Sequence, residues 1–264
     1  MAIPLDKRFL SDEDAARLYS LHNIHASPND YCPTCLKEGF YFWPTKNDRV
    51  ECDCRQQLQY YKHYLNAGIG ALYQRLDWSD YNFPNEELDD LVTSYIANAK
   101  QMVARGIGLI LMGDIGTGKT LLATLMLKEL LKAEYSVFST TFAGMIDMFT
   151  AGWNSNDEKE FFLERVKKSD ILLIDDIGKE YKTKNGLGSS TFDAVLRSRV
   201  QEGKPTFITT NLTVDDMEEG YGSAILSLLA ETSIMHVVEG SDFRQKAGQR
   251  KIQEVMNGLT RPIV

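Results

Sequence analysis

Apolar and β-branched runs alternate with longer amphipathic stretches along most of this chain. The apolar runs have the length of buried strands and cover residues 108–112, 136–141, 171–174, 205–210 and 234–238. Segments with apolar positions at helical spacing lie between or before them, notably at 85–104 and 121–132. Strands that alternate with helices in this way predict an α/β fold, with a parallel sheet covered by helices on both faces.

A glycine-rich octapeptide follows the first of these runs and leads directly into a helical segment. It consists of Gly113, Asp114, Ile115, Gly116, Thr117, Gly118, Lys119 and Thr120, and it fits the phosphate-loop pattern G-x-x-x-x-G-K-[ST]. In such a loop, backbone N–H groups and the positive end of the helix dipole converge on phosphates. Lys119 neutralises their charge, and Thr120 can ligate Mg²⁺. A glycine-rich turn that binds nothing is the alternative, but the strand, the helix and the Lys-Thr pair together favour a nucleotide site.

Two further predicted strands end in polar residues. Asp175 and Asp176 follow the run at 171–174, which delivers both carboxylates to the carboxyl edge of the sheet, beside the phosphate loop. We expect Asp175 to hold Mg²⁺ through water, and Asp176 to orient or deprotonate the water that attacks the γ-phosphate. Acidic pairs also cap helices, but the phosphate loop upstream favours the catalytic interpretation. Asn211 ends the run at 205–210 and either reaches the γ-phosphate as a sensor or simply starts the next turn.

Composition and charge narrow the class of protein. The 264 residues carry a net charge of −8, which argues against a protein that coats nucleic acid nonspecifically through a positive field. No apolar run approaches the roughly 18 residues needed to cross a bilayer, and the first residues lack the basic-then-apolar order of an export signal. We therefore expect a cytoplasmic protein with no membrane partner, made of one sizeable domain and a small appendage.

The four cysteines of the chain lie close together, at Cys32, Cys35, Cys52 and Cys54. A C-x-x-C pair followed by a second close pair can turn four thiolates onto one tetrahedral Zn²⁺; a disulfide or free thiols are the alternatives. Candidate replacement ligands are His22, His25 and His63, although each is more ordinary as a surface histidine. We predict a small zinc-binding domain over residues 1–65 and a nucleotide-binding domain over residues 66–264.

The motifs resemble those of a known family. The segments Gly-Leu-Ile-Leu-Met-Gly-x-x-Gly-Thr-Gly-Lys-Thr, Leu-Leu-Ile-Asp-Asp-Ile-Gly and Lys-Pro-Thr-Phe-Ile-Thr-Thr-Asn are similar to those of the AAA+ ATPases of the DnaC/DnaI helicase-loader group and of the related IstB transposition ATPases. The resemblance covers residues 66–245, with matches also at 67–70, 221–222 and 240–244. It implies an AAA+ core, and the short stretch beyond Val238 is expected to form no full C-terminal lid.

The resemblance also implies a function. Members of this group are nucleoside triphosphatase switches that bind single-stranded DNA, grip a hexameric replicative helicase through an N-terminal zinc module and help to place it on DNA. We therefore expect a Mg²⁺-dependent ATPase, weak without its partner or DNA, that assembles as a homo-oligomer and contacts the helicase through residues 1–65. Two alternatives are an IstB-like transposition regulator, which the cysteines disfavour, and an ATP-binding adaptor with little hydrolysis.

One departure from the family pattern concerns an arginine. Where relatives usually carry an arginine that enters a neighbouring subunit's ATP site, this chain has Leu228. Either Arg197 or Arg199 takes over that role in trans, or self-stimulated hydrolysis is weak. Arg244 is expected to contact phosphate in its own subunit as a second sensor. Surface ion pairs are the alternative role for all three arginines.

Contacts to DNA are expected from local patches, because the net charge is negative. One patch comprises Lys179, Tyr181, Lys182 and Lys184, and the other comprises Arg244, Lys246, Arg250 and Lys251. Solvated surface faces are the alternative for both patches. Phe149 and Trp153 either line the path of the single strand or pack in the core.

Overall fold

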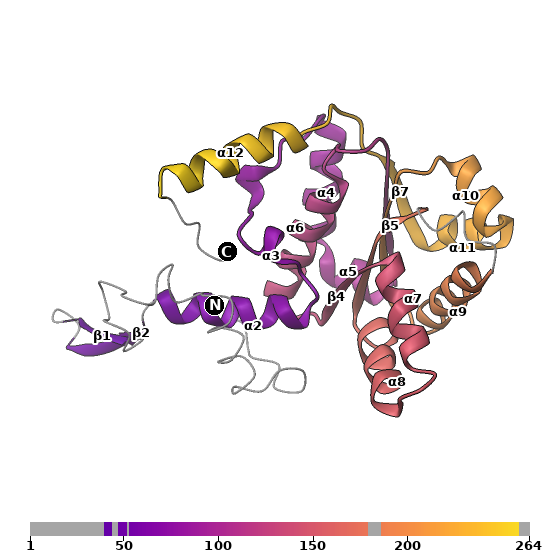
Figure 1. Ribbon diagram of the computed structural model, residues 1–264, viewed down its shortest axis with the longest axis horizontal. Helices are drawn as coiled ribbons and strands as arrows, with labels where there is room; N and C mark the ends of the chain where they lie inside the picture. The colour runs from indigo at the N-terminus through magenta and orange to yellow at the C-terminus, as the bar shows by residue number, and fades with distance from the viewer. Residues whose placement is uncertain (1–39, 44–46, 52, 179–185, 259–264) are drawn as a thin grey trace. The chain divides into compact units, whose positions relative to one another are not determined.

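The computed structural model describes residues 40–43, 47–51, 53–178 and 186–258 (Figure 1). The chain forms two compact units, one made of Met1–Asp77 with Lys246–Val264 and the other of Trp78–Gln245. The predicted domain boundary at residue 65 stays a prediction. Within the ranges given, no helix is long and apolar enough to cross a membrane.

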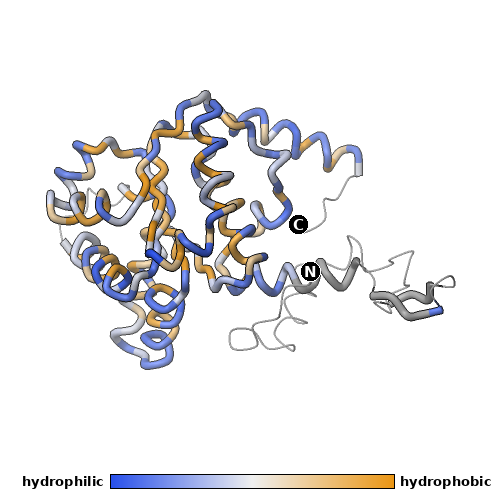
Figure 2. The backbone as a smooth tube through the Cα atoms, turned by 180° about the vertical axis from the view of Figure 1, so that it is seen from behind, coloured by the Kyte–Doolittle hydropathy of each residue, from blue (hydrophilic) through white to orange (hydrophobic). Residues whose placement is uncertain are grey.

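A five-stranded parallel sheet in the order β4-β5-β6-β3-β7 forms the centre of the Trp78–Gln245 unit. Its strands are β3 (Gly108–Met112), β4 (Val137–Thr141), β5 (Ile171–Ile177), β6 (Thr206–Thr210) and β7 (Ser233–Val237). Every residue of β3 and β6 is buried, and Figure 2 shows hydrophobic residues concentrated along the strands of this unit. Strands buried on both faces read as nearly continuous apolar runs, which is why the sequence pattern located them. The predicted parallel sheet is confirmed.

Helices cover both faces of this sheet, as the alternation of runs predicts (Figure 1). The elements are η2 (Trp78–Asp80), α4 (Glu86–Ala97), α5 (Ala99–Ala104), α6 (Lys119–Lys132), α7 (Phe142–Ala151), α8 (Asn156–Phe162), the π-helical turn η3 (Leu163–Lys167), α9 (Leu187–Gln201), α10 (Val214–Tyr221) and α11 (Ser223–Thr232). Helices α7 to α11 bury Phe142, Phe192 and Leu229 in one core with sheet residues such as Ile174 and Ile208. Helices α4 and α6 pack against each other on the opposite face.

The predicted single helix over residues 85–104 is two helices in the structure. Asn85 begins α4 as its N-cap, and its side chain accepts a hydrogen bond from the Leu88 amide at 2.9 Å. At Asn98 the side-chain amide donates to the Ser94 carbonyl at 2.8 Å, and the backbone leaves helical geometry before α5 begins. An asparagine side chain that bonds nearby backbone competes with the helix, and this accounts for the break.

The other unit contains a hairpin and short helices in the part that the structure describes. Strands β1 (Phe40–Trp43) and β2 (Asp48–Glu51) pair antiparallel, and helices α2 (Asp53–Asn66) and α3 (Ala71–Gln74) follow. The remaining helix, α12 (Arg244–Met256), runs from the end of the sheet-containing unit into this one. Cys32, Cys35 and Cys52 lie outside the described residues, and Cys54 lies near the start of α2. The zinc site therefore stays a prediction.

Candidate functional site

The predicted site residues come together at the carboxyl edge of the sheet. Strand β3 runs into the loop at 113–118, β5 carries Asp175 and Asp176 near its end, and β6 is followed by Asn211. Because β5, β6 and β3 are neighbours in a parallel sheet, their carboxyl ends lie side by side. Hydrogen bonds then join the three segments into one cluster.

Lys119 is the central cation of this cluster. Its ammonium group donates to the carbonyls of Gly113 at 2.8 Å and Asp114 at 2.7 Å, and to the Asn211 side-chain oxygen at 2.8 Å. Burial lowers the pKa of Lys119, while the carboxylates of Asp176 and Asp114 oppose that shift. A buried ammonium whose charge is only partly compensated is suited to receive an anion.

The loop itself has the shape of a phosphate cradle. Gly116 and Gly118 have φ angles of 86° and 90°, in the left-handed region that favours glycine. A Cβ atom would lie 2.1 Å from the Asp242 carboxylate at Gly116 and 2.9 Å from the Tyr81 ring at Gly118. Gly118 is the N-cap of α6 and has no side chain with which to cap the first amides of that helix. Such a helix end accepts phosphate oxygens readily.

Hydroxyl and carboxylate oxygens suited to Mg²⁺ lie beside this cradle. The Thr120 hydroxyl donates to Asp175 Oδ1 at 2.8 Å, and the Thr209 hydroxyl donates to the same oxygen at 2.5 Å. Mg²⁺ prefers hard oxygen ligands and is commonly held by a phosphate-loop Thr together with a strand-end carboxylate. The sequence predicted Thr120 and Asp175 as a pair, but it assigned no role to Thr209, which lies in the Thr-Thr-Asn motif.

Asp176 occupies an irregular position at the end of β5. Its φ is 62°, and the β5–β6 ladder shifts register between Ile174 and Ile177, as in a β-bulge. Asn211 donates from its side-chain amide to Asp176 Oδ1 at 3.2 Å. The Asn211 side chain thereby connects Lys119 and Asp176, which favours the site interpretation of this residue over a simple turn.

A segment after β7 lies along the phosphate loop. The Val238 amide donates to the Met112 carbonyl at 2.7 Å, and the Phe243 amide donates to the Gly116 carbonyl at 3.1 Å. Asp242 accepts from the Arg244 amide at 2.9 Å, and Arg244 is close enough to contribute to the lowered pKa of Lys119. The sequence suggested Arg244 but missed the approach of Asp242 to the loop.

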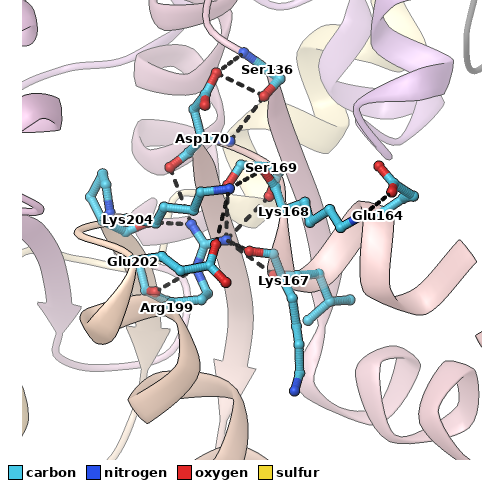
Figure 3. A network of polar contacts seen from close by, with 12 residues as sticks. Ser136, Glu164, Lys167, Lys168, Ser169, Asp170, Arg199, Glu202 and Lys204 are labelled. Carbon is cyan, nitrogen blue, oxygen red and sulfur yellow. Dashed lines mark hydrogen bonds and ion pairs between the residues drawn. The ribbon is translucent and has the colours of Figure 1, made fainter. Parts of the chain in front are cut away.

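Of the alternatives for the missing arginine, a trans role for Arg199 does not fit the structure. Arg199 is completely buried on α9, and its guanidinium donates to the carbonyls of Val166, Lys167, Ser169, Asp170 and Pro205 and to the Thr206 hydroxyl (Figure 3). These groups lie where β5 and β6 begin, at the edge of the sheet opposite the phosphate loop. A group that enters a neighbouring subunit must be exposed and have donors to spare, and Arg199 meets neither condition.

Arg197 and Leu228 lie in contrasting environments. Arg197 is half-exposed on α9 and pairs with Asp193 at 2.8 Å. Leu228 is partly buried and packs against the core. Of the two arginines considered for the trans role, Arg197 alone is exposed.

The residues considered for DNA have mixed outcomes. Lys179, Tyr181, Lys182 and Lys184 lie outside the described residues, and the four basic residues of the second patch are exposed on α12. Phe149 packs edge-on against the core residue Phe162 at 5.5 Å between ring centroids. Trp153 contacts Phe149 but is 63% exposed.

Comparison with known proteins places the chain in a family. The family model described as IstB-like ATP binding protein matches residues 50–254. The uncharacterized protein YdaV of Escherichia coli K12 is 25% identical over 188 residues, which are 70% of this chain and 75% of YdaV. The replicative helicase loader DnaC of the same strain is 24% identical over 164 residues, which are 62% of this chain and 66% of DnaC.

A solved structure shares the fold of the sheet-containing unit. The crystal structure of the DnaC helicase loader superimposes with a TM-score of 0.58 at 20% identity, covering 64% of this chain and all of that one, and this shows the fold alone. The family match spans most of the sequence and coincides with the phosphate loop, the paired carboxylates and the AAA+ sheet. The chain belongs to the IstB-like ATP-binding family of AAA+ ATPases, as the resemblance of its motifs predicted.

Proposed function

We propose that this protein hydrolyses ATP in the presence of Mg²⁺ at the carboxyl edge of its sheet. The observation that carries the proposal is the hydrogen-bonded cluster in which Lys119, Thr120, Asp175, Asp176 and Asn211 meet from separate strands and one helix. Phosphoryl transfer requires a cation for the phosphates, oxygen ligands for Mg²⁺ and a group that orients the attacking water, and this cluster contains residues for all three. When bound, Mg²⁺ supplies positive charge to the β- and γ-phosphate oxygens.

Different residues of this chain bind the phosphates, hold the metal and accept the proton of the attacking water. The amides at the start of α6 and the Lys119 ammonium bind the phosphates, since both are aimed into the loop. Thr120 and Asp175 hold the metal, and Asp176 takes the proton of the attacking water while ADP leaves from the γ-phosphorus. Asn211 fixes the positions of Asp176 and Lys119 relative to each other, because its side-chain amide forms a hydrogen bond with each.

We also propose that the protein acts as a loader of a hexameric replicative DNA helicase onto single-stranded DNA. The AAA+ fold shared with the DnaC loader and the DnaC relative support this proposal. The four cysteines support it as well, because the loader group that the motifs resemble contacts its helicase through a zinc module at this end of the chain. In this proposal the protein assembles as a homo-oligomer on DNA.

Two other functions have observations in their favour. The family description favours an IstB-like regulator that serves a transposase on duplex DNA. The apolar packing of Leu228 favours an adaptor that binds ATP and scarcely hydrolyses it, because no arginine at that position reaches a neighbour.

One set of assays distinguishes the three functions. ATP turnover of the full-length chain is measured alone, with single-stranded DNA and with a hexameric replicative helicase, and the same chain is used to capture either helicase or transposase. The loader proposal expects helicase capture and stimulated turnover. Capture of a transposase without the helicase would replace it by the second function, and ATP binding without turnover under every condition would replace it by the third.

A further inference from the structure

Thr209 contacts both aspartates of the site, the side chain of Asp175 and the backbone of Asp176, from the buried strand β6. The residue is 1% exposed. Its hydroxyl donates to Asp175 Oδ1 at 2.5 Å and accepts from the Asp176 amide at 2.9 Å. A hydroxyl has one proton to donate, so Thr209 commits its only donor to the Asp175 carboxylate.

The backbone of Asp176 depends on this hydroxyl. In a regular ladder the amide of a central strand donates to a neighbouring strand, but the register shift between Ile174 and Ile177 interrupts that pattern. The Thr209 hydroxyl accepts the Asp176 amide instead. A non-glycine residue at a φ of 62° is disfavoured and persists where its surroundings hold it.

The side chain of Asp175 is held from two sides. Thr120, at the start of α6, and Thr209, on β6, both donate to the same carboxylate oxygen. Two donors on one oxygen fix the rotation of the carboxylate relative to the phosphate loop. One hydroxyl on β6 therefore sets the side chain of one aspartate and the main chain of the next.

We propose that Thr209 is the positioning residue of this site, holding Asp175 in the orientation that binds Mg²⁺ and Asp176 in the conformation that meets the attacking water. The proposal rests on the proposed ATP hydrolysis. Thr209 acts through the two aspartates and makes no hydrogen bond to the phosphate loop, so its loss affects turnover and the Mg²⁺ requirement more than nucleotide binding. Partners behind a metal ligand typically change activity or metal affinity about 10- to 100-fold when removed.

The neighbouring Thr210 provides a matched control. Thr210 is also completely buried in β6, but its hydroxyl donates to the Ile177 carbonyl at 2.7 Å and accepts from the Leu212 amide at 3.0 Å. Replacing either threonine with valine keeps the shape of the side chain and removes one hydroxyl together with the two hydrogen bonds that it makes. Only the change at Thr209 removes a bond to Asp175 or Asp176.

The test compares Thr209→Val, Thr209→Ser and Thr210→Val in the full-length chain. For Thr209→Val we expect kcat to fall about 10- to 100-fold and the Mg²⁺ concentration for half-maximal turnover to rise, with the Kd for ATP measured without Mg²⁺ changing less than about threefold. Thr209→Ser restores both turnover and the Mg²⁺ requirement. Thr210→Val lowers the melting temperature but changes neither.

The outcomes separate the two proposals. An active wild type with Thr209→Val equal to Thr210→Val in kcat and Mg²⁺ requirement would overturn the role of Thr209 alone. A wild type without ATP turnover under every condition would overturn the proposed function, and the role of Thr209 with it. If Thr209→Val does not fold, Thr209→Cys, whose thiol is a weak donor, replaces it and is judged by the same two measurements.

Discussion

Replacing Arg199 with methionine should lower the free energy of unfolding by about 3–5 kcal/mol, because several buried main-chain carbonyls then lose a charged donor. The guanidinium links the π-helical turn η3 and the residues before β5 to the start of β6 (Figure 3). Methionine fills a similar length but donates nothing. Each buried acceptor left without a donor costs about 1–3 kcal/mol. The total stays below the simple sum because the Pro205 carbonyl also accepts the Leu172 amide.

Two further variants make this prediction specific. Arg199→Lys keeps a charge but replaces the planar fork with a single ammonium, so roughly half of the loss should remain. Arg197→Met, two residues away on the same helix, removes a half-exposed pair with Asp193 and should cost only about 0.3–0.5 kcal/mol. Urea unfolding followed by circular dichroism measures all three. An Arg199→Met protein as stable as Arg197→Met would show that the guanidinium network does not hold these strands.

The same variants test whether either arginine acts between subunits. Because Arg199 is fully buried, Arg199→Met should keep the wild-type turnover per folded molecule at a temperature where it is folded. Arg197→Met should lose any turnover that rises with protein concentration, if Arg197 supplies charge to a neighbouring site. A loss of turnover in folded Arg199→Met with Arg197→Met unaffected would refute this assignment.

Three other changes have defined outcomes. Lys119→Ala should abolish ATP binding measured by calorimetry while leaving the circular dichroism spectrum unchanged, because the cradle loses its buried cation; unaltered affinity would contradict the site assignment. Thr213→Ala should lower the melting temperature at pH 7 by roughly 2–4 °C, because α10 loses the side chain that caps it. Hydrogen bonds from Thr213 lower the pKa of the Asp216 carboxyl in the folded protein. The stability that they add is present above the pKa of Asp216 in the unfolded chain, and it is lost as the pH falls through the pKa of Asp216 in the folded protein. The difference in melting temperature between the two proteins should therefore narrow in acid, although the bond from the Asp216 amide to the Thr213 hydroxyl remains; a difference that does not depend on pH would exclude the coupling. Metal analysis of the full chain should find one zinc ion, absent from Cys35→Ser; a wild type without zinc would refute the predicted cysteine site.

The sheet and the phosphate loop were predictable because their signals are local. Each strand is an unbroken apolar run, and burial on both faces requires that run whatever its neighbours are. The order of strand, glycine loop and helix fixes where Lys119 and Thr120 lie relative to each other. Asp175 and Asp176 were located for the same reason, since the end of a parallel strand determines the edge of the sheet at which they emerge.

The features that escaped prediction depend on register between distant segments. Thr209 reaches Asp175 and Asp176 only because β5 shifts by a bulge beside β6, and no spacing within either strand encodes that shift. Asp242 lies against Gly116 through a segment that follows a different strand. Both positions look like ordinary polar residues until the strands are paired.

Arg199 is different, because the sequence did contain a signal for its burial. Phe192, Val195, Leu196 and Arg199 stand at i, i+3, i+4 and i+7 along α9, the spacing of one helical face, and all four are buried. Arg197 stands on another face with Asp193 four residues before it, as expected of an exposed ion pair. Helical position therefore distinguishes the two arginines without coordinates, and a cation in phase with an apolar stripe is best interpreted as one that holds main-chain carbonyls. The resemblance implies an arginine at the position of Leu228, and Arg197 is the candidate that remains of the two considered to replace it. The turnover of Arg197→Met as a function of protein concentration tests that role.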